Sequence, residues 1–129
     1  MAPWLAPPGP VTGDTTTGAA TGTDRETTRV RDRLARIQDD LKRVRATERV
    51  LAEQVAYLAE VAQDAETRKL VAQTPLADRE WRDARTDLDR HAGLLEEARS
   101  QAQALVDQRD GLLERLFELE AARPGRDDP

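Results

Sequence analysis

A Thr-Pro pair divides the chain into two long segments that share one heptad pattern. Proline has no backbone N–H and disfavours helical geometry in the residue before it, so Thr74 and Pro75 predict a helix N-cap followed by a first helical position. On both sides, core positions recur in alternating steps of four and three, which is the a/d pattern of a coiled coil. The first series is Val30, Leu34, Ile37, Leu41, Val44, Glu48, Leu51, Val55, Leu58, Ala62, Ala65, Lys69 and Ala72, and the second is Ala77, Trp81, Ala84, Leu88, His91, Leu95, Ala98, Ala102, Leu105, Arg109, Leu112, Leu116 and Leu119.

The two series are out of phase at the proline. An unbroken helix would place the next core position at Leu76, whereas the apolar pattern resumes at Ala77. Charged residues make up 35% of the chain and aromatic residues 3%, which is typical of a coiled coil and not of a large globular core. We therefore predict an all-α fold, a long antiparallel helical hairpin (a two-helix coiled coil) over 25–123, with helices at about 25–73 and 78–122 and a turn at about 74–77. The alternative is one long kinked helix.

The two ends of the chain show no heptad pattern. Residues 1–24 are rich in Pro, Gly, Thr and Ala, so they are expected to form a disordered N-terminal arm. Trp4 and Leu5 within this arm are either a short docking motif or residues without a role. Residues 124–129 are expected to be a disordered C-terminal tail. We expect neither a secretory signal nor insertion into a membrane, because no apolar run approaches the length of a span.

Charge favours the hairpin over a parallel dimer. Residues 25–49 carry nine Arg and Lys against five Asp and Glu, and residues 93–123 carry seven acids against four bases. A hairpin brings these stretches together, whereas a parallel dimer of the first helix aligns like charges.

Two registers of the hairpin are possible. The favoured one pairs Leu34 with Leu119 and places Glu48 beside Arg109, so that two core charges meet. It requires a loop of several residues. The charged pairs flanking its seam would be Glu66–Arg85, Arg68–Asp87, Asp40–Arg115 and Arg31–Glu120.

The other register is displaced by one heptad and pairs Thr27 with Leu119. It allows a tighter turn. It also places Arg33 against Arg115 and Glu66 against Asp78, which are pairs of like charge.

The sequence offers little for catalysis or cofactor binding. His91 is the only histidine, there is no cysteine, and Ser100 is the only serine, with no base placed to activate it. There is no glycine-rich phosphate loop. His91 is expected to be a neutral packed residue. We therefore expect no enzyme activity, no metal site and no cofactor.

The basic run from Arg25 to Arg49 does not favour nucleic-acid binding. It is interleaved with acidic residues and contains no aromatic residue that could stack on a base. The absence of cysteine fits a reducing compartment, and the bias to Arg, Ala and Asp suggests a bacterium with GC-rich DNA. We expect a bacterial cytoplasmic protein that does not bind nucleic acid.

Several apolar residues lie off the a/d seam. Those closest to the seam, Val61, Leu94, Val106 and Leu113, can widen it. Four others lie farther from it and predict an interface with a protein partner or a second copy: Val50, Tyr57, Val71 and Phe117. The expected function is therefore a non-enzymatic scaffold that acts by self-association or by laying a helix into a partner's groove.

The tip of the hairpin suggests an alternative function. It presents carboxylates and a large aromatic side chain, on Leu76, Asp78, Glu80 and Trp81. In outline this is similar to regulators that insert a coiled-coil finger into a larger enzyme, such as the transcript-cleavage factors of RNA polymerase. Those factors carry a further globular domain with no counterpart here, so we claim no membership of that group. Trp81 can equally be a core residue that closes the hairpin.

Overall fold

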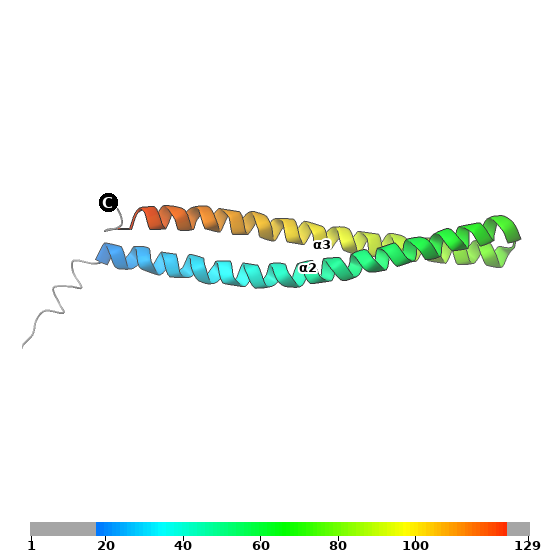
Figure 1. Ribbon diagram of the computed structural model, residues 1–129, viewed down its shortest axis with the longest axis horizontal. Coiled ribbons are helices and arrows are strands. Elements are labelled where there is room, and N and C mark those ends of the chain that lie inside the picture. Colours follow the sequence, from blue (N-terminus) through cyan, green and yellow to red (C-terminus); the bar gives the residue numbers. More distant parts are fainter. Residues whose placement is uncertain (1–17, 124–129) are drawn as a thin grey trace, which may run out of the picture. The chain divides into compact units, whose positions relative to one another are not determined.

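The computed structural model describes residues 18–123 as two helices joined by a tight turn. Helix α2 spans Gly18–Ala72 (55 residues) and helix α3 spans Pro75–Ala121 (47 residues). The two helices pack against each other with opposite chain directions (Figure 1), and no strand occurs among the described residues. The prediction of an all-α antiparallel hairpin is confirmed.

The first helix begins earlier than the heptad pattern indicates. Helix α2 starts at Gly18, seven residues before the predicted start at residue 25. Extending an existing helix fixes one residue per hydrogen bond gained, so a stretch without proline can join it even without apolar periodicity. The rest of the predicted arm, with Trp4 and Leu5, and the predicted tail at 124–129 lie outside the described residues.

The turn consists of Gln73 and Thr74. Gln73 adopts a left-handed backbone conformation with φ of 51°, and its N–H donates to the Lys69 carbonyl over 3.0 Å. The Thr74 hydroxyl accepts from the N–H of Ala77 at 3.1 Å, as the N-cap prediction requires. Helix α3 therefore begins at Pro75, three residues before the predicted start at 78, and the turn is shorter than the predicted 74–77.

The chain forms two compact units. One is Gln38–Asp107, which contains the turn, and the other joins the residues up to Ile37 with those from Gln108 onward. Both units bury residues of the predicted a/d seam. The buried side chains of the first are Leu41, Ala62, Ala65, Ala77, Leu95, Ala98 and Ala102, and those of the second are Thr27, Val30, Ile37 and Leu119.

Ion pairs between the helices define the register of the Gln38–Asp107 unit. Lys69 lies four residues before Gln73 and Asp78 four residues after Thr74, and their charged groups are 3.7 Å apart. Glu48 and Arg99, each 25 residues from the same turn, also approach to 3.7 Å. The pairing is thus symmetric about a two-residue turn, whereas the favoured register needed a longer loop.

The favoured register is therefore wrong for this unit, whose pairs fit the register displaced by one heptad. In the other unit Asp24 and Arg123 approach to 3.8 Å, which fits the displaced register that pairs Thr27 with Leu119. Both of these residues are buried in the other unit, where the Thr27 hydroxyl donates to the Thr23 carbonyl at 2.9 Å. Of the four flanking pairs predicted for the favoured register, Arg31–Glu120 forms, at 2.6 Å, because a long arginine side chain spans the displacement. Elsewhere Arg68 pairs with Glu80, Arg85 with Asp89 and Arg115 with Glu26.

Candidate interaction surfaces

The four residues predicted to bind a partner are all exposed. Their exposed fractions range from 53% for Val50 to 80% for Val71, with Tyr57 at 65% and Phe117 at 70%. The residues predicted to widen the seam are more covered: Val61 and Val106 are half-buried, and Leu94 and Leu113 are 43% and 36% exposed. The apolar residues near the seam are therefore less exposed than the four that lie farther from it, although Leu94 and Leu113 stay partly uncovered.

Val50 and Tyr57 form one surface on α2. They are seven residues apart, so they share a helix face, and they line an open hollow of about 430 Å³. The other lining residues are Glu53, Gln54, Leu58 and His91. His91 is half-buried, and its Nδ1 lies 2.9 Å from the carbonyl of Asp87 one turn earlier on α3. His91 therefore lies at the α3 side of the hollow, next to Val50 and Tyr57.

Val71 and Phe117 are not part of this hollow. Val71 follows Tyr57 by two heptads on the same line of α2, next to the turn, whereas Phe117 belongs to the other unit. Of the four predicted residues, the structure brings only Val50 and Tyr57 together. We call the surface made by Val50, Gln54 and Tyr57 the α2 face.

The tip carries an apolar cluster that is only partly predicted from the sequence. Leu76 is 63% exposed, as expected for a docking residue, and Leu70 and Val71 before the turn are also exposed. The sequence interpretation missed Leu70. The signal is its place directly after Lys69, which is an a position, because the b position that follows points outwards in a heptad.

The charged and aromatic groups of the predicted tip are engaged within the hairpin. The Lys69 ammonium lies 3.8 Å from the centre of the half-buried Trp81 ring. A hydrogen bond from Arg82 lowers the pKa of Asp78, and the charges of Arg82 and Lys69 add to the effect. Trp81 therefore lies half-buried, with its ring against the ammonium of Lys69.

Glu80 is also paired, with its carboxylate 3.9 Å from Arg68. The tip therefore presents exposed apolar side chains together with carboxylates that are paired within the hairpin.

The two predicted core charges have separate partners. Glu48 pairs across the hairpin with Arg99, and the guanidinium of Arg109 lies 3.4 Å from its neighbour Asp110. Both Glu48 and Arg109 are half-buried, so their charged ends reach the edge of the seam. The prediction that Glu48 and Arg109 meet was wrong, because it followed from the rejected register.

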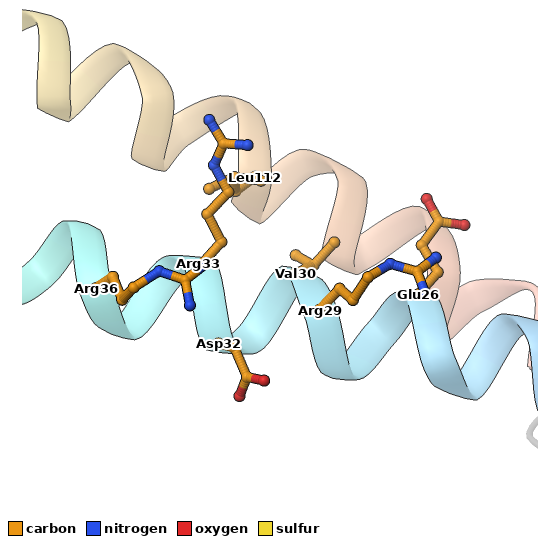
Figure 2. A pocket seen from close by; sticks show the side chains of 7 residues that line it. All are labelled: Glu26, Arg29, Val30, Asp32, Arg33, Arg36 and Leu112. Carbon is orange, nitrogen blue, oxygen red and sulfur yellow. The ribbon is translucent and has the colours of Figure 1, made fainter.

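Arginines of α2 line a second hollow, of about 440 Å³, in the other unit (Figure 2). Arg33 reaches from α2 towards α3 beside Leu112, whereas Asp32 points away from it. Arg33 and Arg36 make no ion pair with any described residue. At one end, Glu26 accepts two hydrogen bonds from Arg115, both 2.9 Å. These bonds lower the pKa of Glu26 and, with the hydrogen bond from Arg115 to Glu118, raise the pKa of Arg115.

The described residues meet the needs of neither a metal site nor a membrane span. Over that part, no three His, Asp or Glu side chains gather closely enough to hold a metal ion. Neither α2 nor α3 contains an apolar stretch that could cross a bilayer. No protein-family model, curated protein or solved structure matches this chain.

Proposed function

We propose that this chain is a non-enzymatic coiled-coil interaction protein that acts through an exposed helix face, by self-association or by binding in the groove of a protein partner. The observation that carries the proposal is the α2 face, where Val50 and Tyr57 lie exposed beside one hollow although the hairpin already has a complete seam. Exposed apolar side chains that share one face are a common feature of protein interfaces.

The arrangement of the charged groups also supports a structural role. Glu26, Glu48, Asp78 and Glu80 each pair with an arginine or lysine on an exposed or half-buried surface. Glu26, Glu48 and Glu80 pair across the hairpin, so these carboxylates join the two helices. We place the protein in a bacterial cytoplasm, because the sequence has no cysteine and a composition typical of GC-rich genomes.

Site-specific photo-cross-linking tests the proposal. A photoreactive phenylalanine analogue at Tyr57, in the full chain and in the cells that make it, is expected to yield a discrete covalent adduct with another polypeptide. The matched control is Gln63, an exposed position on the same helix outside the α2 face. If Tyr57 gives no more adduct than Gln63, the proposal fails.

A second candidate function places the contact at the tip, as in a regulator that docks its hairpin end into a larger enzyme such as RNA polymerase. The exposure of Leu70, Val71 and Leu76 around the turn favours it. Because Asp78, Glu80 and Trp81 are engaged within the hairpin, the docking residues would be the three apolar ones.

The two candidates differ in where a cross-linker reacts. The tip candidate predicts an adduct from the photoreactive analogue at Leu76 and none at Tyr57. Adducts at Tyr57 alone would exclude it.

A further inference from the structure

We infer that the occupant of the α2 face is a second copy of this chain, whose α2 packs antiparallel to the first across a two-fold axis beside Gln54. This inference rests on the proposed function and names its partner. It concerns only the Gln38–Asp107 unit, which contains every residue used below.

The apolar part of the contact is self-complementary. The midpoint between Val50 and Tyr57 falls between Glu53 and Gln54, so an antiparallel partner turned about this point places Val50 of each copy on Tyr57 of the other. A contact of this kind, in which one patch meets itself, is what a two-fold dimer requires. The Tyr57 side chain of each copy can then fill the hollow beside Val50 of the other.

Helix α3 extends the same face. The ion pair between Arg68 and Glu80 shows that these positions flank the same side of the hairpin seam. Gln54 precedes Arg68 by two heptads and Leu94 follows Glu80 by two heptads, so Gln54 and Leu94 also share that side. Leu94 is 43% exposed, which adds a further uncovered apolar residue to the surface.

Charge selects the antiparallel arrangement of two copies. On the line through Val50 and Tyr57, Arg43 lies seven residues before Val50 and Asp64 lies seven residues after Tyr57. The pairing that joins Val50 to Tyr57 therefore also places Arg43 of each copy opposite Asp64 of the other, so two equivalent ion pairs form.

The residues around Arg43 are mostly basic and those around Asp64 are acidic, so the neighbouring charges also favour the antiparallel pairing. Residues 42–49 carry four Lys and Arg against one acid, and residues 60–66 carry three acids and no base. A parallel pairing would instead align the basic stretch of one copy with that of the other. In the single chain Arg43 hydrogen-bonds the exposed Asp40, and Asp64 has no ion pair with a described residue. An exposed pair is weak, so Arg43 can be shared with the second copy.

Charge reversal tests this arrangement in the full chain. Sedimentation equilibrium is expected to show a dimer whose dissociation constant rises about tenfold in Arg43→Asp and in Asp64→Arg, because each change turns two attractive pairs into repulsive ones. Combining the two changes restores opposite charges, so the double variant should return towards the affinity of the unaltered chain. Additive weakening in the double variant would overturn the inference.

Arg85→Asp is the matched control. Like Arg43, Arg85 is exposed and pairs with a carboxylate of its own helix. It directly follows the core position Ala84, whereas Leu94 directly precedes Leu95, so the two flank opposite sides of the seam. Arg85→Asp should leave the dissociation constant unchanged, and a loss equal to that of Arg43→Asp would show that the effect is not specific to the α2 face.

A single cysteine tests the position of the axis. The chain has no cysteine of its own, so Gln54→Cys can only form a disulfide with another copy. It should cross-link rapidly under mild oxidation, whereas Gln63→Cys should not. Failure of Gln54→Cys to cross-link faster than Gln63→Cys would contradict the axis.

The outcomes separate this inference from the proposed function. A chain that stays monomeric, but still gives an adduct with a different polypeptide at Tyr57, would contradict the inference that a second copy covers the α2 face. The proposed interaction function would remain. A monomer without any Tyr57 adduct would overturn both.

Discussion

The ammonium of Lys69 lies 3.8 Å from the centre of the Trp81 ring, close to the turn. The same ammonium is 3.7 Å from Asp78, so one lysine at a core position joins an aromatic ring and a carboxylate of the opposite helix. These contacts cover the end of the seam that lies beside the turn. They also account for a lysine at a core position, because its stem packs while its charge stays at the surface.

Replacing Lys69 by alanine is expected to destabilise the hairpin by about 1 kcal/mol, the sum of a cation–π contact and a partly exposed ion pair. Urea denaturation followed by circular dichroism measures the change. Lys42 is the only other lysine, and it makes no ion pair or ring contact with the described residues. Lys42→Ala should therefore leave the unfolding free energy unchanged, and equal effects of the two substitutions would contradict the role of Lys69.

The turn offers a substitution that should stabilise the protein. Gln73 has a φ of 51°, in the left-handed region that glycine adopts without a steric penalty. Gln73→Gly is expected to raise the free energy of unfolding by about 1 kcal/mol. Ala46→Gly, at an exposed position inside α2, should lower it by a similar amount, about 1 kcal/mol. A loss of stability in Gln73→Gly would show that the turn does not need the left-handed conformation.

The Glu26–Arg115 pair predicts a dependence of stability on pH. Hydrogen bonds from Arg115 hold the pKa of Glu26 below its ordinary value of 4.5, so the folded state favours the ionised carboxylate. The pair therefore contributes stability above that value, and the contribution is lost as the pH falls through the lower pKa of the folded state. Arg115 stays charged over this whole range, because the pair raises its pKa further.

Thermal unfolding of Glu26→Gln tests this dependence. The variant should be less stable than the unaltered chain at pH 7, and the difference should vanish in acid. A difference that is constant from pH 7 to pH 2 would show that the carboxylate does not gain its stabilisation from Arg115.

Much of the fold could be predicted from the spacing of residues. Thr74 and Pro75 predict the position of the turn because proline restricts the backbone on both sides of itself. The heptad pattern predicts that Val50 and Tyr57 lie off the seam, and both are exposed. These predictions depend on local geometry, which the sequence determines directly.

The register depends on which ion pairs the long charged side chains form. The spacing of residues in the sequence does not determine these pairs. The favoured register assumed that Glu48 and Arg109 are buried and must meet, but each is half-buried and pairs elsewhere. The like-charge contacts that counted against the correct register are relieved in the same way. Asp78 has Arg82 and Lys69 as partners, and Arg115 has Glu26.

Disulfide trapping checks the register. Because Thr27 and Leu119 are buried and paired in the observed register, Thr27→Cys with Leu119→Cys should form an intramolecular disulfide at low protein concentration. Leu34→Cys with Leu119→Cys should not, since Leu34 is about 10 Å farther along α2 at 1.5 Å per residue. Non-reducing electrophoresis and mass spectrometry distinguish the two outcomes, and the reverse result would restore the rejected register.

The most direct test of the α2 face is the absolute mass of the full chain, measured by light scattering after size exclusion over a range of concentrations. We expect a species of twice the chain mass of 14.4 kDa, which falls to the monomer mass in Tyr57→Ser and is retained in the equally exposed tip variant Leu76→Ser. A mass of 14.4 kDa at every concentration would contradict the pairing of two copies through Val50 and Tyr57.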